Sequence, residues 1–113
     1  LVDNITNKFD EVFNNKYNDD ELIEHCGGGS CYCYHSLPFS YAVFLRNPRS
    51  IETLYDVVNL GGDTDSNGSF VGSLLGALNG IEFFPEHLIN GLVDKDKILD
   101  VAERFYNSLS ERI

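Results

Sequence analysis

The chain has 113 residues and a formal net charge of −10, because 18 Asp and Glu outweigh 8 Lys and Arg. This length fits one modest domain or part of a larger one, and 42% hydrophobic residues supply material for a core. The acidity argues against partners such as nucleic acid or a membrane surface, and no apolar stretch approaches the roughly 20 residues of a membrane span. Because the chain begins with Leu1 and contains no Met, we expect it to be a piece of a longer protein.

The first third of the chain predicts two helices and a break. Apolar residues recur with helical spacing over residues 2–13, and a short acidic helical turn follows a polar connection at residues 21–25. Three consecutive glycines, Gly27–Gly29, then interrupt regular structure.

Three cysteines, Cys26, Cys31 and Cys33, lie in this region between His25 and His35. An odd count packed into eight residues does not fit a disulfide framework, so we expect reduced thiols in a cytoplasmic protein. A zinc site is the alternative. It is disfavoured because all five candidate ligands crowd one loop and no C-x2-C spacing is present, so ordinary buried or half-buried thiols are the better interpretation.

The middle of the chain predicts two further helices. The first begins with Ser36 as cap and Pro38 in its first turn, and ends at Asn47-Pro48. Ser50 caps the next, with an acid in the first turn where the helix dipole favours it, and Gly61-Gly62 ends it.

The last third predicts helices over residues 66–79, within 83–92, and from the cap Asp94 to about 109. No stretch alternates with period two, so the predicted fold class is all-α, a single all-α segment over residues 1–113. Glycines recur every four residues along the helix over residues 66–79 and at its end, and the three interior ones together cost about 3 kcal/mol relative to Ala. We therefore expect a deeply buried helix whose glycine face presses closely on a neighbour. These glycines are Gly68, Gly72, Gly76 and Gly80.

An acidic glycine turn precedes this helix. Asp63 and Asp65 are two positions apart, so their carboxylates lie about 5 Å apart and repel by roughly 3 kcal/mol. Thr64 and Ser66 add hydroxyl groups. A cluster of oxygens favours hard ions such as Mg²⁺, Mn²⁺ or Ca²⁺, so this turn is a candidate metal site, and simple helix capping by one Asp is the alternative.

A calcium-binding EF-hand loop is a weaker alternative. Its first half matches Asp63-x-Asp65-x-Asn67-Gly68, but the Glu required at loop position 12 is replaced by Leu74. We assign Asn67 no role beyond the helix start.

The acidic turn and its flanks resemble the C-terminal metal motif of the ADP-ribosylglycohydrolase family. The resemblance extends from about residue 27 to residue 106. It is carried by VNLGGDTDS (58–66), GSLLGALNG (72–80), SLPFS (36–40), FLRNP (44–48), FPE (84–86) and the helix over 98–105.

The resemblance implies the C-terminal part of an orthogonal multi-helix bundle with a buried glycine-faced helix. It also implies hydrolysis of the glycosidic bond between ADP-ribose and a protein side chain such as Arg or Ser, or of a related ADP-ribose conjugate, at a two-metal centre that holds Mg²⁺ and in some members Mn²⁺. By motif position, Asp63 and Asp65 would be carboxylate ligands and Ser66 a hydroxyl ligand. The metals would anchor ribose hydroxyls and activate water.

The chain departs from the family in length. The other half of the metal cage and the proposed catalytic acid come from an N-terminal portion of family members, so we expect no catalytic residue in this chain. We expect the isolated chain to be inactive and to bind metal weakly until the N-terminal portion of the same protein is supplied. The alternative is a non-catalytic relative that retains the fold, like the lens crystallins of the family, or one that only binds ADP-ribose.

Candidate substrate-binding residues lie in the glycine segment. Gly28, Gly29 and Ser30 have backbone N–H groups suited to a phosphate, and His35 lies where it can support the site. A flexible connection is the alternative for the glycine run.

Overall fold

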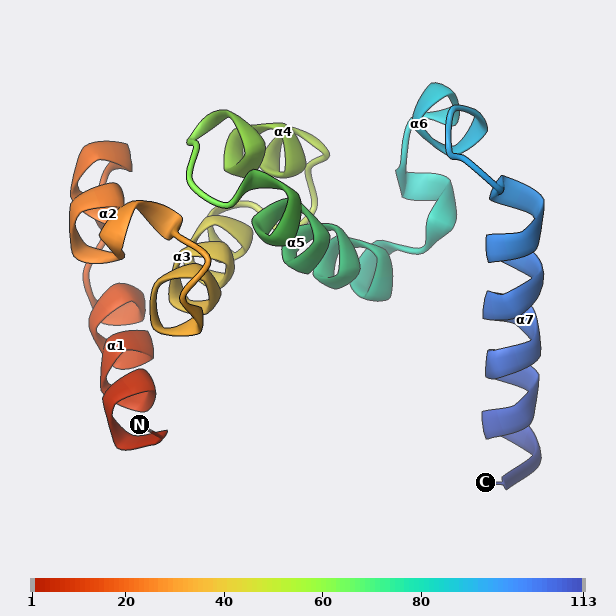
Figure 1. Ribbon diagram of the computed structural model, residues 1–113, viewed down its shortest axis with the longest axis horizontal. Coiled ribbons are helices and arrows are strands. Elements are labelled where there is room, and N and C mark those ends of the chain that lie inside the picture. Colours follow the sequence, from red (N-terminus) through yellow and green to blue (C-terminus); the bar gives the residue numbers. More distant parts are fainter. Residues whose placement is uncertain (1, 113) are drawn as a thin grey trace. The chain divides into compact units, whose positions relative to one another are not determined.

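The computed structural model describes residues 2–112, and of Val2 only the backbone. In that part of the chain every regular element is a helix and none is a strand, so the predicted all-α class is confirmed (Figure 1). No helix of the described residues has both the length and the apolar character needed to cross a membrane. The elements are α1 (Val2–Asn14), α2 (Asp19–His25), η1 (Gly27–Gly29), α3 (Cys33–Arg46), α4 (Glu52–Asn59), α5 (Thr64–Asn79), η2 (Ile81–Phe83), α6 (Glu86–Asn90) and α7 (Lys95–Arg112).

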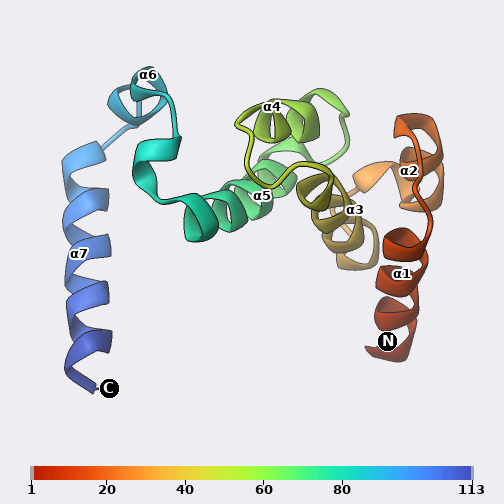
Figure 2. The same cartoon turned by 180° about the vertical axis from the view of Figure 1, so that it is seen from behind.

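The chain divides into two compact units, Leu1–Phe83 and Phe84–Ile113. In the first unit α3 is the central helix, because α1, α4 and α5 all pack against it, and α4 also packs along α5 (Figures 1 and 2). Apolar side chains from five helical segments and the residue after α2 form its core. The buried hydrophobic residues are Val12, Leu22, Cys26, Phe39, Val43, Val57, Val71 and Leu75.

Helix α2 begins with a capping box. The Asn18 side chain accepts a hydrogen bond from the backbone N–H of Glu21 at 2.9 Å, and the Glu21 carboxylate accepts one from the N–H of Asn18 at 3.3 Å. The reciprocal pair satisfies N–H groups that a helix start otherwise leaves unpaired. Helix α2 begins at Asp19, two residues earlier than the sequence predicts, and its Leu22 is buried.

Helix α3 begins earlier than predicted. The sequence favours a start at Ser36 with Pro38 in the first turn, but the helix begins at Cys33 and Tyr32 is its cap residue. The Tyr32 carbonyl oxygen accepts hydrogen bonds from the N–H groups of His35 (2.8 Å) and Ser36 (2.9 Å), which close an additional turn. Pro38 therefore lies inside the helix and is buried, and the predicted cap, Ser36, is wrong by four residues.

The connection from α3 to α4 is held by side chains. The Ser50 hydroxyl accepts the N–H of Glu52 at 3.2 Å, as expected of a capping residue. The buried Thr53 hydroxyl donates to the Asn47 carbonyl at 2.6 Å. From the far end of α5, the Asn79 amide donates to the carbonyls of Pro48 and Leu75, each at 2.9 Å. The C-terminal end of α5 is thus tied to the α3–α4 connection.

Helix α5 starts at Thr64, two residues before the predicted start, and ends before Gly80 as predicted. Fewer of its residues are buried than expected, because only Asn67, Val71 and Leu75 are buried. Gly68 and Gly72 of the glycine face lie against α4, whereas a Cβ on Gly80 would meet nothing within 4 Å. A Cβ built on Gly68 would lie 3.3 Å from a Val58 methyl group, and one on Gly72 would lie 3.8 Å from a Leu54 methyl group. The predicted close approach is therefore found at Gly68, while Gly72 is at ordinary contact distance.

The second unit contains α6 and α7. Pro85 is the cap residue of α6. Asp94 immediately precedes α7 and its carbonyl accepts the Ile98 N–H at 3.0 Å, but its φ of +56° is left-handed and not the extended conformation typical of a capping residue. The Arg104 guanidinium donates to the Asp100 carboxylate at 3.0 Å, an i, i+4 contact on an exposed face. None of the α7 residues described is buried.

Candidate metal and substrate site

The acidic turn, residues 61–66, joins α4 to α5. Gly61 and Gly62 have φ of +88° and +77°, so both adopt the left-handed conformation that glycine tolerates best. The chain then enters α5 at Thr64, with Asp63 as the cap residue. The helix therefore begins inside the segment that an EF-hand would need as its loop, and Leu74 lies within α5. The EF-hand alternative is excluded for this turn.

The Asp63 carboxylate does not cap the helix. Its backbone carbonyl accepts the N–H of Asn67 at 2.9 Å, but its side chain accepts no hydrogen bond from the first turn. The ordinary role of an Asp at this position is to accept such a bond. The Asp63 carboxyl group interacts instead with that of Asp65, whose pKa it lowers. The capping alternative does not account for this pair.

Hydrogen bonds hold the Asp65 carboxyl in its charged form. The contact from Asp63 is the largest cause that lowers the Asp65 pKa below its ordinary value of 3.8, followed by the backbone N–H groups of Ser66 and of Asp65 itself. The Ser66 N–H lies 3.0 Å from the Asp65 carboxylate. Asp63 is half-buried and Asp65 is exposed, so the pair opens to solvent on one side.

The donor set suits a hard cation. Asp63 and Asp65 supply two interacting carboxyl groups, and the half-buried Ser66 adds a hydroxyl oxygen in the same turn. Oxygen ligands of this kind fit Mg²⁺, Mn²⁺ or Ca²⁺. In residues 2–112, however, no three His, Cys, Asp or Glu side chains are gathered closely enough to hold a metal. A cation at this pair would therefore need further ligands from another segment.

The same observation removes the zinc alternative for the cysteine segment. Cys26 is buried, whereas Cys31 and Cys33 are exposed. Burial raises the pKa of the Cys26 thiol to about 11, which disfavours the thiolate that zinc needs. The prediction of ordinary thiols is confirmed for Cys26, but the other two are more exposed than expected.

The glycine loop, Gly27–Ser30, is held against the acidic turn. The Gly29 carbonyl accepts a hydrogen bond from the Asp63 N–H at 2.9 Å. The two backbones approach so closely that a Cβ on Gly62 would lie 2.2 Å from the Gly28 carbonyl oxygen and 2.6 Å from that of Gly29. All three loop glycines have positive φ. The loop is thus a packed feature of the site and not the flexible connection considered from sequence.

His35 holds the other side of the glycine loop. Its Nδ1 lies 2.7 Å from the Ser30 hydroxyl, and its ring covers Gly27, where an added Cβ would lie 2.6 Å from ring atoms. The Tyr32 ring meets the His35 ring edge-on at 5.2 Å. The structure therefore pairs Ser30 with His35. In the described residues, no hydrogen bond or ion pair joins His35 to the Asp63 and Asp65 carboxylates.

Sequence reasoning missed Asn67. This side chain is completely buried, and its amide nitrogen donates to the Gly29 carbonyl at 2.9 Å while its oxygen accepts from the Ser40 hydroxyl at 3.2 Å. A usable signal was its spacing: Asn67, Val71 and Leu75 form one i, i+4, i+8 row, so Asn67 falls on the buried face of α5.

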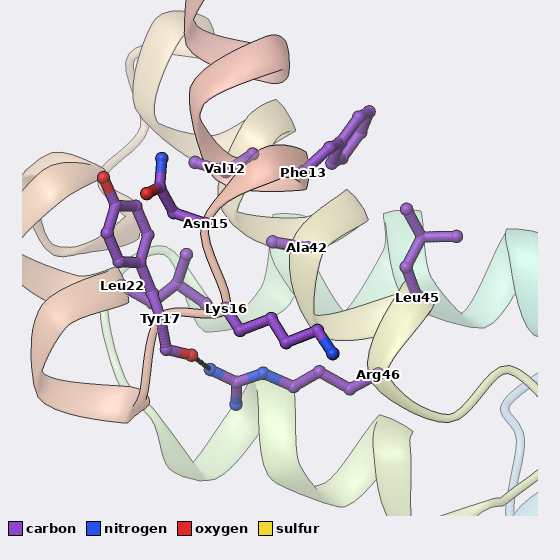
Figure 3. A pocket seen from close by; sticks show the side chains of 9 residues that line it. All are labelled: Val12, Phe13, Asn15, Lys16, Tyr17, Leu22, Ala42, Leu45 and Arg46. Carbon is purple, nitrogen blue, oxygen red and sulfur yellow. Dashed lines mark hydrogen bonds between the residues drawn. The ribbon is translucent and has the colours of Figure 1, made fainter.

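A separate hollow of about 410 Å³ opens between α1, α2 and α3, and no residue of the acidic turn lines it (Figure 3). Its walls are mostly apolar, and the side chains of Lys16 and Arg46 lie at one end. Arg46 is engaged there, because it donates to the Asp19 carboxylate at 2.5 Å and to the Tyr17 carbonyl at 3.1 Å. This arrangement fixes α2 to the end of α3.

Comparison with known proteins adds one finding. The sequence model of the ADP-ribosylglycohydrolase family matches residues 3–112. Neither the curated proteins nor the solved structures give a match. The family match covers nearly the whole chain and includes the glycine loop, the acidic turn and both units. The chain therefore belongs to the ADP-ribosylglycohydrolase family.

Proposed function

We propose that this chain is the metal-holding C-terminal portion of a hydrolase that cleaves the glycosidic bond between ADP-ribose and a protein side chain or a related conjugate. Family membership supports hydrolysis of an ADP-ribose conjugate. The observation that carries the metal dependence is that the Asp63 side chain accepts no cap hydrogen bond from α5 and instead interacts with the Asp65 carboxyl, whose pKa it lowers.

In this proposal Asp63, Asp65 and Ser66 hold one side of a two-metal centre, with Mg²⁺ as the expected ion and Mn²⁺ as a possible substitute. When bound, the metals would orient ribose hydroxyls and supply an activated water. The chain's own contribution is to present three oxygen ligands from one turn and to neutralise the positive charge of the ions. The remaining ligands and the catalytic acid are expected from the N-terminal portion of the same protein.

The glycine loop is the proposed substrate contact. Gly28 is half-buried, and a Cβ built on it would meet nothing within 4 Å, so a ligand can approach its backbone directly. Gly29 and Ser30 lie next to it, and His35 keeps the Ser30 hydroxyl in place. We expect these residues to contact the ADP-ribose moiety. With a net charge of −10, the chain repels the diphosphate, so bound cations would also favour substrate binding.

Metal binding is tested with the 113-residue chain labelled with ¹⁵N. Mn²⁺ broadens amide resonances close to it, so we expect residues 61–66 to broaden first during a titration, even when affinity is weak. Asp65→Asn should weaken this effect more than about tenfold. Asp96→Asn is the matched control, because Asp96 is also an acid in the first turn of a helix, and it should leave the titration unchanged. Broadening spread evenly over all acidic residues would contradict the proposed site.

The reaction is tested after joining the chain to its N-terminal portion. We expect release of ADP-ribose from an ADP-ribosylated peptide to require Mg²⁺ or Mn²⁺ and to be lost in Asp65→Asn but retained in Asp96→Asn. Binding of ADP-ribose that is independent of metal, with no hydrolysis, would instead identify a non-catalytic relative.

A further inference from the structure

One carbonyl oxygen joins the glycine loop to the acidic turn. The Gly29 oxygen accepts the backbone N–H of Asp63 and the side-chain N–H of Asn67, each at 2.9 Å. Both donors belong to the start of α5, whereas Gly29 lies more than 30 positions earlier. The two lone pairs of a carbonyl oxygen allow this double use. A shift of the loop therefore changes the positions of both groups.

The orientation of the Asn67 amide is determined by its partners. A carbonyl oxygen only accepts, so the Asn67 nitrogen must face Gly29. The Ser40 hydroxyl, 3.2 Å away on α3, then donates to the Asn67 oxygen. Asn67 is 0% exposed, so water cannot replace either partner. The side chain is held from two directions and has one hydrogen-bonded arrangement in the described structure.

We infer that Asn67 is a positioning residue that couples the glycine loop to the Asp63–Asp65 pair. It contacts neither the proposed metal nor the substrate, but it fixes the carbonyl to which Asp63 is bonded. A cation that orders Asp63 then also orders the loop, and a ligand on the loop favours the metal-binding arrangement by the same factor. The metal and substrate roles in this inference rest on the proposed function, whereas the coupling of loop and turn does not.

The test compares two asparagines of α5. Both donate from the side chain to a loop carbonyl, Asn67 to Gly29 at the start of the helix and Asn79 to Pro48 at its end. Asn67→Leu and Asn79→Leu each remove such a bond with similar change of shape. We expect the amide hydrogen of Asp63 to exchange at least about tenfold faster in Asn67→Leu, and to remain as in the unmodified chain in Asn79→Leu. Exchange measured by NMR needs no metal or substrate.

The second measurement is the Mn²⁺ titration in the presence and absence of ADP-ribose. The loss of an outer partner of a metal site typically weakens affinity by about 10–100-fold, and we expect this for Asn67→Leu only. We also expect ADP-ribose to tighten Mn²⁺ binding in the unmodified chain and not in Asn67→Leu. If Asn67→Leu does not fold, Ser40→Ala removes one hydroxyl only, and should speed Asp63 exchange several-fold.

The outcomes separate the two proposals. Unchanged exchange of the Asp63 amide in both Asn67→Leu and Ser40→Ala would overturn the coupling, as would equal effects of Asn67→Leu and Asn79→Leu. Absence of Mn²⁺ broadening in the unmodified chain would overturn the proposed metal site. In that case, faster Asp63 exchange confined to Asn67→Leu and Ser40→Ala would still support the coupling of loop and turn.

Discussion

The backbone N–H of Asp63 donates a 2.9 Å hydrogen bond to the carbonyl oxygen of Gly29. This backbone contact joins two glycine-containing segments that are distant in the sequence. It depends on Gly62, the residue before Asp63, because that position faces the carbonyl groups of the loop.

Gly62→Ala is expected to destabilise the first unit strongly. The new methyl group would lie 2.2 Å from the Gly28 carbonyl oxygen, and at φ +77° the substitution also adds left-handed strain. The strain costs about 1–2 kcal/mol and the overpacking about 1–3 kcal/mol more. Urea unfolding, followed at amide resonances of α5, measures the sum.

Gly61→Ala is the matched control for that substitution. Its φ is +88°, but an added Cβ meets nothing within 4 Å. We expect it to lose only the strain contribution of about 1–2 kcal/mol. Equal losses of stability in the two variants would show that the close approach at Gly62 does not exist in solution.

Stability above pH 9 is expected to depend on Cys26. Burial raises the pKa of this thiol from 9.0 to about 11, so between these pH values the folded chain retains a proton that the unfolded chain loses. The contribution of the Cys26 thiol to the free energy of unfolding is therefore fully present below pH 9. It is lost as pH rises from 9 to 11, which lowers the free energy of unfolding by about 2–3 kcal/mol for two pKa units. The free energy of unfolding, measured at pH 8, 9, 10 and 11, should fall less with rising pH in Cys26→Ala than in the unmodified chain. Cys31→Ala, which changes an exposed thiol, should retain the slope of the unmodified chain.

The three thiols are also expected to differ in reactivity. Cys31 and Cys33 are exposed and Cys26 is buried, so iodoacetamide at pH 8 should modify two sites in the native chain and a third only in urea. Mass spectrometry of the modified peptides identifies the sites. Rapid modification of Cys26 in the native chain would indicate that α2 and η1 open far more readily than their burial suggests.

Asn18→Ala is expected to cost about 1 kcal/mol of stability, because it removes the side-chain acceptor of the capping box. Asn18→Asp keeps an acceptor in the same place and should cost much less. Faster hydrogen exchange of the Glu21 amide in the Ala variant would locate the loss at the start of α2. If Asp and Ala at this position gave the same stability, the hydrogen bond to Glu21 would contribute nothing.

Local sequence features predicted most of the helices. The apolar period of α1, the glycine after α5 and the Asp before α7 are local features, and they indicate the extent of α1, the end of α5 and the start of α7 to within one residue. The start of α3 was wrong because Pro38 suits a first turn, whereas the Tyr32 carbonyl and its two N–H donors allow another turn before it. The proline indicates a helix start just before it, whereas in the folded chain the helix starts one turn earlier.

The candidate site was predicted only in part. The acids of the acidic turn were identified because two carboxylates so close in sequence need a reason to remain together. Asn67 was missed because its partners, Gly29 and Ser40, lie 38 and 27 positions away, and no local pattern shows such contacts. The sequence also left open whether the glycine loop is packed or flexible, because its packing depends on Gly62, which lies in a distant segment.

Helix α5 is fixed at both ends by side-chain amides, with Asn67 bonded to Gly29 and Asn79 bonded to Pro48. A helix that moves by one residue must rise about 1.5 Å and rotate by about 100°. Either component of that screw motion would break both attachments at once. The carboxylates at the start of α5 consequently cannot be retracted by sliding the helix, and any adjustment of the acidic turn must come from the glycine backbone before it.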